Sequence, residues 1–501
     1  MVEDTGRIES VILSSEESDG FLGLWLDYGD SNDVGTQTAQ RFDLENAPVG
    51  ERFVTGTVDY FTRRQSLTMA PSGEFVVSWT YGYDDPCPPN HGPDCDFFAA
   101  YARKFDRDGS PITNPVRITD GDQGSTDRSN EGTEPVSAMR ADGGFLVAWR
   151  DDLGESIRAR SYDTDLTPES PYVVVGEHPG IGPFGVSPPH IAYRPGGGYT
   201  IVWKALPADT ETLAEFWLRH IDSAGQPAGD ATLVGNGHRS ASKPARVAYA
   251  DDGRGLVVWL DADPDAVTHA NSDRIQSRAI RADGSLAPNI RGAALDEDGL
   301  QSLDLVALRN DDSFAVAWRA RDTATLEARR LTLDGEPVGD ISTLRAFSPD
   351  PPLNLPAWDL EAGTNGELIV AWEQADEATL LTQRFGSPCG GEILCLGADD
   401  RFRVQVNWRV DNGGEGRGNV RDQQTLDTGS FWFFNADNVE LVVKVLDGRP
   451  INGHFWVFYG SLSNVAFDLK ITDTVTGRRA LYQNNSGTQA SRGDTQALPS
   501  D

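Results

Sequence analysis

Short apolar runs that end in tryptophan recur along most of the chain. They read GFLGLWL (20–26), GEFVVSWT (73–80), GGFLVAWR (143–150), GGYTIVWK (197–204), GRGLVVWL (253–260), DSFAVAWR (312–319) and GELIVAWE (366–373). Their tryptophans are Trp25, Trp79, Trp149, Trp203, Trp259, Trp318 and Trp372, spaced 54 to 70 residues apart. Each run follows a Gly or Asp turn and is rich in strand-forming residues. A repeat of this length predicts a propeller or a solenoid built of strands.

A second pattern follows each tryptophan and completes the repeat. It reads AQRFD (39–43), ARKFD (102–106), ARSYD (159–163), LRHID (218–222), SRAIR (277–281), ARRLT (328–332) and TQRF (382–385). Five copies lead into a turn and a proline, a strong hairpin signal because Gly accepts the positive φ of a tight turn. Four antiparallel strands in each of seven units predict a seven-bladed β-propeller, with the repeated Trp in the core between blades.

After residue 395 the tryptophan repeat stops and a different strand pattern begins. RFRVQVNW, SFWFFN, VELVVKVLD, GHFWVFYG and VAFDLKITD are separated by Asn, Asp and Gly turns. We therefore expect an all-β chain with a propeller over 1–395 and a small β-sandwich over 396–501. GSPCGG after the third strand of the last repeat is poor strand material. The fourth strand of that blade is expected from EILCL (392–396), from the N-terminus or from a neighbouring subunit.

The C-terminal segment resembles a module found on secreted proteins of acidobacteria and other Gram-negative bacteria. The residues that carry the resemblance are LCLGADDRFRVQVNW, DTGSFWFFNADNVELVVKVLDGRPINGHFWVFYGSLSNV and ITDTVTG. The resemblance implies export and an accessory role, with no catalytic residues. The repeat region looks like the divergent propellers of secreted bacterial proteins, and it lacks both the Trp-Asp ending of WD40 blades and the SxDxGxTW box of sialidase-type propellers.

Charge excludes several classes of partner. The 43 basic and 77 acidic side chains give a net charge of −34, of which residues from 396 onward contribute 11 basic and 13 acidic groups. The repeat region therefore carries about −32, which repels nucleic acid and anionic lipid. No stretch reaches the roughly 18–20 apolar residues that span a bilayer, so we expect no membrane span.

The four cysteines form two local pairs, Cys87 with Cys95 and Cys389 with Cys395. Their even number, close pairing and loop context predict two disulfides in an oxidising compartment, secreted or periplasmic, with the signal peptide absent from this sequence. The alternatives are four reduced thiols or one four-cysteine zinc site. Neither pair has the CxxC spacing typical of zinc.

The chain offers no local catalytic motif. HExxH, GxSxG, a P-loop and a strand-led GxGxxG are all absent, and the seven histidines are scattered singly. We expect no cofactor, with calcium as the one ion to consider, because DGDQGSTD (120–127), DADPD (261–265) and DEDG (296–299) resemble oxygen-rich calcium loops. Solvated acidic turns are the simpler interpretation of these segments.

Two features of the repeats bear on binding. Arginine recurs in the third strand at Arg103, Arg160, Arg219, Arg278 and Arg329, with Gln40 and Gln383 in the end blades. We interpret it as a repeated structural pair with a turn carboxylate rather than as an anion site. The second repeat has the longest loop, WTYGYDDPCPPNHGPDCDFFAAYAR. Loops on rigid scaffolds carry recognition, so its candidate binding residues are Tyr81, Tyr83, Asp84, Asp85, His91, Phe97 and Phe98.

These observations support two functional hypotheses. The first is an exported, non-enzymatic binding or structural protein that self-assembles into an oligomer or polymer and contacts glycans or a cell-surface component. The tail GTQASRGDTQALPSD has little apolar content to dock on its own domain, which favours contacts with neighbouring copies. The second is a glycan-binding or polysaccharide-active propeller with its site at the central channel face. Carboxylates converging from different blades would favour the second.

Overall fold

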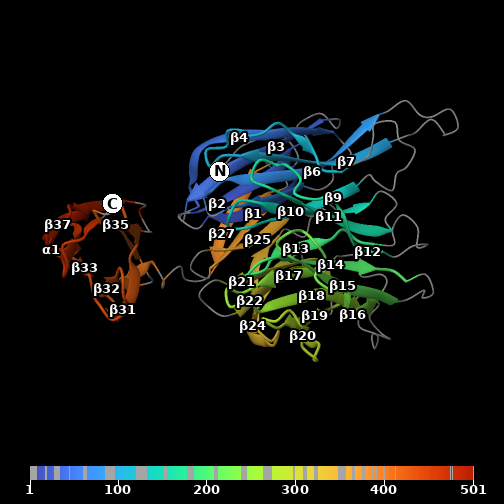
Figure 1. Ribbon diagram of the computed structural model, residues 1–501. Helices are drawn as coiled ribbons and strands as arrows, with labels where there is room; N and C mark the ends of the chain where they lie inside the picture. The colour runs from blue at the N-terminus through green and yellow to red at the C-terminus, as the bar shows by residue number, and fades with distance from the viewer. Residues whose placement is uncertain are drawn as a thin grey trace. The chain divides into compact units, whose positions relative to one another are not determined.

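The structure is a computed structural model that describes residues 8–499 apart from short gaps. The gaps are 17–19, 28–33, 44–45, 60–64, 71, 85–95, 120–131, 152–154, 178–185, 208–212, 239–244, 263–272, 297–299, 309–312, 321–324, 348–356, 364–366, 375–378, 386–388, 390–391, 399–400, 412, 474–475 and 477. The chain is all-β, as predicted, and divides into two compact units (Figure 1). One unit comprises Met1–Thr364 and Leu368–Phe385, and the other comprises Asn365–Glu367 and Gly386–Asp501.

The described residues of the first unit form seven small antiparallel sheets. In chain order they are β1 (Ile8–Glu16), β2 (Gly20–Asp27), β3 (Val34–Asp43) and β4 (Pro48–Asp59); β5 (Gln65–Met69), β6 (Phe75–Asp84), β7 (Asp96–Phe105) and β8 (Val116–Arg117); β9 (Gly132–Met139), β10 (Phe145–Asp151), β11 (Ser156–Tyr162) and β12 (Val173–Glu177); β13 (His190–Tyr193), β14 (Tyr199–Ala205), β15 (Leu213–Ile221) and β16 (Thr232–His238); β17 (Arg246–Tyr249), β18 (Gly255–Ala262), β19 (Asp273–Ile280) and β20 (Arg291–Asp296); β21 (Leu300–Leu308), β22 (Ser313–Ala320), β23 (Thr325–Thr332) and β24 (Pro337–Ala346); and β25 (Trp358–Ala362), β26 (Leu368–Gln374) and β27 (Thr379–Phe385). Each sheet is one copy of the sequence repeat, and the strands of each sheet pair in sequence order.

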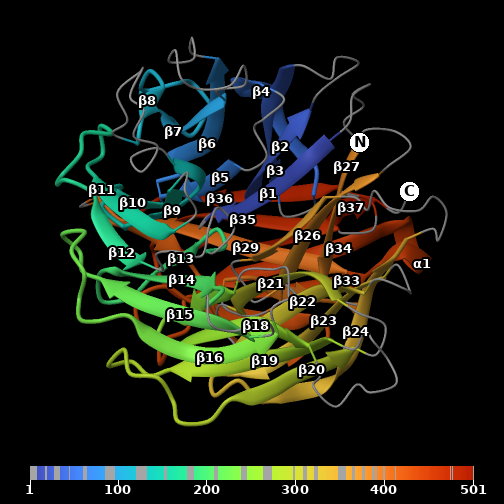
Figure 2. The same cartoon turned by 90° about the vertical axis from the view of Figure 1, so that its right-hand side faces the viewer.

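The sheets are the blades of a β-propeller. Their first strands, β1, β5, β9, β13, β17, β21 and β25, contact one another in succession, and β25 contacts β1. We call these seven strands the inner ring. Figure 2 shows β1, β5, β9, β13 and β21 near the centre, with β4, β8, β12, β16, β20 and β24 at the periphery. Among the described residues, the ring is closed by packing between blades, since no sheet there combines strands from the two ends of the repeat region.

The repeated tryptophans form the core between blades, as predicted. All seven are buried, and each lies in an apolar cluster shared with the preceding blade. Trp203, for example, packs on Gly176 of β12, where an added Cβ would lie 2.3 Å from the indole. In the closing cluster, Trp25 of the first blade packs with Ile369 and Ala371 of the seventh. One Trp for each interface explains why the motif recurs.

The seventh blade has three strands among the described residues. EILCL, one of the three sources considered for its fourth strand, does not supply it, because β28 (Leu394–Leu396) pairs with β29 (Phe402–Arg409) in the second unit. Residues 1–7, the other segment of this chain considered for that strand, lie outside the described residues. Arg384 of β27 donates to the Asp43 carbonyl (3.3 Å) and to Asn46 Oδ1 (3.2 Å) of the first blade.

The second unit consists of two five-stranded sheets with one shared core. The first contains β28, β29, β30 (Glu415–Arg417), β35 (Ala466–Asp473) and β36 (Arg479–Asn484). The second contains β31 (Asn419–Thr425), β32 (Thr428–Trp432), β33 (Leu441–Asp447), β34 (His454–Ser461) and β37 (Ser491–Pro499). Burial alternates along β29, β33 and β34, so one face of each sheet supplies the core. A four-residue helix, α1 (Arg449–Asn452), connects β33 to β34.

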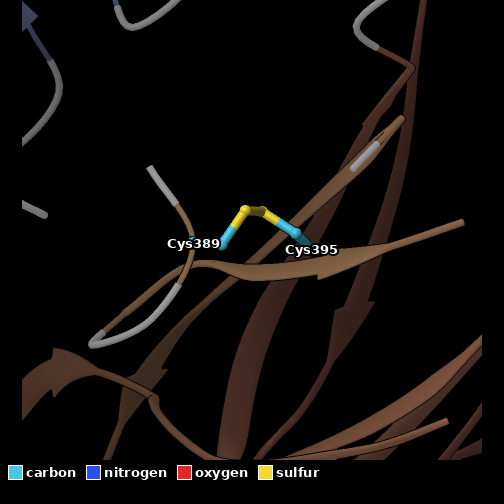
Figure 3. The surroundings of a disulfide bond; sticks show 2 residues. All are labelled: Cys389 and Cys395. Carbon is cyan, nitrogen blue, oxygen red and sulfur yellow. A yellow bond between two sulfur atoms is a disulfide. The ribbon is translucent and has the colours of Figure 1, made fainter. Parts of the chain in front are cut away.

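One of the two predicted disulfides lies within the described residues. Cys389 and Cys395 are bonded, with their Cα atoms 5.4 Å apart (Figure 3). The bond closes a short loop at the start of the second unit, and Cys395 is buried within β28. The Cys87–Cys95 pair lies outside the described residues and stays a prediction.

The C-terminal tail is part of the second unit. Its strand β37 pairs with β34 along most of its length, and Leu498 is completely buried in the shared core. The expectation that this tail would not dock on its own domain is therefore wrong. Ladder hydrogen bonds and a single apolar anchor are sufficient to hold a strand of otherwise polar composition.

Candidate functional site on the inner ring

One level of the inner ring is defined by strand pairing. In each blade the residue before the repeated Trp pairs with one residue of the inner strand. These inner-strand partners are Ile12, Ser66, Val136, His190, Arg246, Asp304 and Asp359. We call them the axial level, since equivalent positions in successive blades lie at the same height around a propeller.

The axial level is divided into two halves. Blades four to seven supply His190, Arg246, Asp304 and Asp359, all partly exposed to solvent. The side chains of Arg246 and Asp304 expose 25% and 17% of their surface. Blades one to three supply Ile12, Ser66 and Val136, which are apolar or small. Four chemically active side chains thus lie side by side on consecutive strands, and water reaches them.

Asp304 and Asp359 form a hydrogen-bonded pair of acids across β21 and β25. The Asp359 Oδ2 atom also accepts a hydrogen bond from the backbone N–H of Leu13 on β1 (2.7 Å). Burial raises the pKa of Asp359 well above its ordinary value, and the adjacent Asp304 carboxyl adds to the increase. Two carboxylates this close cannot both ionise readily, so the pair holds a proton that an isolated Asp would lose.

Asp304 has a different environment from its partner. Its Oδ1 atom accepts from the Arg246 Nε–H (3.3 Å) and from the backbone N–H of Leu305 (2.8 Å). The Arg246 Nη1–H lies 3.5 Å from the Ala245 carbonyl, which orients the guanidinium. A cationic donor and a backbone donor thus converge on one oxygen of Asp304.

His190 completes the polar half in the neutral form. The backbone N–H of Val247 donates to its Nδ1 atom (3.2 Å), so the imidazole proton lies on Nε2. Burial lowers the pKa of His190 well below its ordinary value, and the positive charge of Arg246 lowers it further. Around neutral pH this residue is therefore a hydrogen-bond donor without charge.

A structural role accounts for part of this arrangement. Each inner strand is the edge of its sheet, and its outward N–H groups need acceptors. Ser66 accepts from the Ser137 N–H (3.0 Å) in the same way that His190 and Asp359 accept from the next blade. A serine hydroxyl is sufficient for this bond. The structural role therefore explains an acceptor at the axial level but not a second carboxyl and an Arg beside it.

The aromatic residues predicted to bind lie elsewhere in the fold. Tyr81, Tyr83 and Asp84 are at the end of β6, where Tyr83 pairs with Phe97 and Gly82 with Phe98 of β7. The two strands therefore extend further into the long segment than its composition suggested. Asp85 and His91 lie outside the described residues. Binding by this group stays a prediction.

The recurring arginine is structural, but its partner differs from the prediction. Arg103, Arg160, Arg219, Arg278 and Arg329 each donate from Nε to a backbone carbonyl nine or ten residues later in their own blade. In the first blade, Gln40 donates to the Val49 carbonyl (3.0 Å). The expected partner was a turn carboxylate. Carbonyls take its place, and in the blade of Arg219 the acceptor, Gly229, lies before the outer strand β16.

The structure gives no support to a metal site within the described residues. No group of three His, Cys, Asp or Glu there has the arrangement of a metal site. The acidic segment 120–127 is outside the described residues, as are most of 261–265 and 296–299. Calcium at those segments stays a prediction. In the described part of the chain, no helix is long and apolar enough to cross a membrane.

This chain resembles several solved structures at low sequence identity. No known family matches the sequence, and no curated protein matches it. The solved structures that resemble it include an α-L-arabinanase of Penicillium chrysogenum (15% identity, TM-score 0.41, covering 65% of this chain and 93% of that one). A polysaccharide lyase matches at 10% identity and TM-score 0.41, covering 75% and 89%. The propeller domain of the Trilobed protease from Pyrococcus furiosus matches at 9% identity and TM-score 0.42, covering 77% and 96%.

The prediction that this chain is not an enzyme is contradicted by these neighbours, two of which are enzymes acting on glycans, and we withdraw it. At these TM-scores the likeness assigns neither a reaction nor a substrate. The prediction was based on the absence of local catalytic motifs, and that criterion fails for a propeller. Side chains of the inner ring are about 55 residues apart in the chain, so their grouping leaves no short motif.

A signal for the axial level was present in the sequence. Six of its seven residues lie 13 positions before the repeated Trp, and Asp304 lies 14 positions before Trp318. Aligning the repeats on Trp brings His190, Arg246 and Asp359 into one column. The repeat patterns considered above lie in the Trp strands and the strands after them, whereas the axial level lies in the strands before them.

Proposed function

We propose that this protein is a polysaccharide-active enzyme whose site is the polar half of the axial level. The observation that carries the proposal is the hydrogen-bonded pair Asp304–Asp359, partly open to water on adjacent inner strands with Arg246 beside it. A carboxyl whose pKa is raised, so that it keeps its proton to higher pH, is the group that glycoside hydrolysis requires as general acid.

The pair acts as one proton donor rather than as the two flanking carboxyls of a glycosidase. Those carboxyls are about 5–5.5 Å apart in retaining enzymes and about 6.5–9.5 Å apart in inverting enzymes. A direct hydrogen bond holds Asp304 and Asp359 closer together than either. In the proposed step the Asp359 proton passes to the glycosidic oxygen as its bond to the anomeric carbon breaks. Water supplies the hydroxyl to that carbon, and its remaining proton restores the pair.

The axial level matches the surface chemistry of a neutral sugar. A sugar ring has hydroxyls around its rim and C–H groups on its faces. The polar half offers carboxyl, guanidinium and imidazole groups, and the other half offers Ile12 and Val136. Charge in the polar half is compensated, because Arg246 pairs with Asp304 and His190 is neutral. A net charge of −34 also repels polyanions.

Export fits this function. The Cys389–Cys395 bond supports an oxidising compartment, and polysaccharides are encountered outside the cytoplasm. We infer that the chain is secreted or periplasmic. Expression with cytosolic and periplasmic targeting, followed by thiol labelling of unfolded protein, tests this inference. Free thiols in the periplasmic product would count against it.

Activity is tested on a polysaccharide panel. Neutral arabinan, xylan, mannan and β-glucan are compared with anionic polygalacturonate and alginate by release of reducing ends, and by ultraviolet absorbance of unsaturated products. We expect hydrolysis of a neutral polymer and its loss in D359N and D304N. The matched control is D340N, which changes an exposed Asp on the outer strand β24. Equal activity in wild type, D359N and D304N would rule out this site.

A further inference from the structure

The acid pair contains two chemically identical side chains, and the contacts around them are unequal. Asp304 accepts from a cationic donor and a backbone N–H, through Arg246 Nε (3.3 Å) and Leu305 N (2.8 Å). Asp359 accepts one backbone N–H, from Leu13, at 2.7 Å. Among the described residues, Asp359 has no cationic partner in an ion pair. The difference between the two carboxyls is therefore Arg246.

We propose that Arg246 is a positioning residue that assigns the shared proton of the pair to Asp359. A carboxyl beside an opposite charge is favoured in its charged form. Arg246 lies beside Asp304 and acts on it directly. Asp304 thus carries the negative charge and accepts the hydrogen bond that Asp359 donates.

The groups around Asp359 reinforce this assignment. Glu361 on its own strand and Asp304 on β21 are both acidic, and both disfavour a charge on Asp359. Asp359 pairs with Ala371 on β26, and the Leu13 N–H on β1 donates a hydrogen bond to it. Beyond Asp304, Arg246 and the neutral His190 follow on the next two inner strands. Among these neighbouring side chains the cation is Arg246, and Asp304 lies between it and Asp359.

The inference has a consequence for catalysis that rests on the proposed function. A defined proton position means that the same carboxyl, Asp359, is the acid in every molecule. Without Arg246, the charge on Asp304 would lose its compensation and the pair would hold its proton more tightly. The acid would then remain protonated to higher pH and would transfer its proton less readily.

The test follows the titration of Asp359 without using any substrate. Urea unfolding is measured from about pH 4 to about pH 8 for wild type, R246M and R246K, each with and without D359N. Within each pair of variants only residue 359 differs, so the changed titration of His190 cancels to first order. The quantity followed is the difference in free energy of unfolding between the proteins with Asp and with Asn at position 359, as a function of pH. We expect the midpoint of this curve to rise by about 1–2 pH units in R246M and to return to the wild-type value in R246K. The control is R254M, which removes an exposed Arg of the same blade that pairs with Asp252. An unchanged midpoint in R246M would overturn the proposal.

A second measurement does not depend on the stability of Arg246 variants. The carbonyl stretch of a protonated carboxylic acid is recorded in infrared difference spectra of wild type against D359N and against D304N near neutral pH. Loss of the band in D359N supports the assignment, and loss only in D304N overturns it. Failure of the polysaccharide panel with these results intact would reject the proposed function and leave the proton assignment standing.

Discussion

At the scale of single residues, Asp359 links the site to the stability of the fold. Its pKa is raised by burial and by Asp304, so between the ordinary and the raised pKa the folded chain binds a proton that the unfolded chain has lost. The free energy of unfolding then falls as pH rises through this interval and levels off above the folded pKa. The residue is retained at a cost in stability near neutral pH, as expected of a functional group.

The first prediction concerns D359N. Asparagine keeps an acceptor for the Leu13 N–H and a donor for Asp304, but it does not titrate. From about pH 4 upward, wild type should therefore lose stability relative to D359N by about 1.4 kcal/mol for each unit of pKa elevation. Urea denaturation over a pH series checks this slope, with D340N as the exposed control. A constant difference between wild type and D359N at all pH values would contradict it.

At the scale of elements, three of the recurring arginines, Arg219, Arg278 and Arg329, hold their blades to the previous one. Arg219 of β15 donates from Nε to the Gly229 carbonyl of its own blade (2.9 Å). Its Nη1 atom donates to the Val174 and Val175 carbonyls of β12 in the previous blade (3.2 and 3.1 Å). Arg278 repeats this pattern on Leu233 and Val234. One planar guanidinium thus donates hydrogen bonds to backbone carbonyls of two neighbouring blades.

The second prediction is that R219M and R219K are both destabilising. Loss of a donor to buried carbonyls costs about 1–3 kcal/mol. Lysine cannot reproduce the fork geometry and should recover only a small part of this free energy. The measurement is thermal and urea unfolding of the full chain, with R254M as the matched exposed variant. Full recovery in R219K would show that charge alone is sufficient.

Strand elements were predictable from the sequence, whereas the site was not. Alternation and the Trp motif identify the strands because burial between blades imposes the same apolar residues on each repeat. No such constraint acts at the axial level, where Ser66, His190 and Asp359 all serve as acceptors for the next strand. Their identities differ from blade to blade, so no repeat appears. The bulged outer strands were also missed, since a bulge depends on pairing rather than on composition.

The third prediction concerns the Cys389–Cys395 bond. The two residues are six positions apart, and closing so short a loop contributes about 2 kcal/mol in the chain-entropy model. C389A/C395A should lower the free energy of unfolding of the second unit by about this amount and leave the propeller unchanged. Hydrogen exchange followed by peptide mass spectrometry resolves the two units. Equal loosening of both units would contradict the expectation.

At the scale of the whole molecule, the C-terminal tail does not support self-assembly. Strand β37 pairs with β34 of its own unit, so contacts from neighbouring copies are not needed to hold it. Self-assembly stays a prediction, supported only by the seventh blade, whose described residues form three strands. Deleting residues 487–501 would not test self-assembly, because it removes strand β37 from the core and should unfold the second unit.

The last prediction follows from the uneven distribution of charge between the units. With Glu367 and Glu392 included, the second unit has 11 basic and 15 acidic groups, which leaves −30 of the net −34 for the propeller unit. Like charges on one compact body repel one another, and salt screens them with a Debye length of about 10 Å at 0.1 M and about 3 Å at 1 M. Raising sodium chloride from about 0.05 M to about 1 M should therefore slow hydrogen exchange in the propeller strands by more than in the second unit. A neutral osmolyte at matched water activity separates screening from general effects on hydration. The same gain in both units, or a gain with the osmolyte alone, would show that charge repulsion does not limit the stability of the propeller.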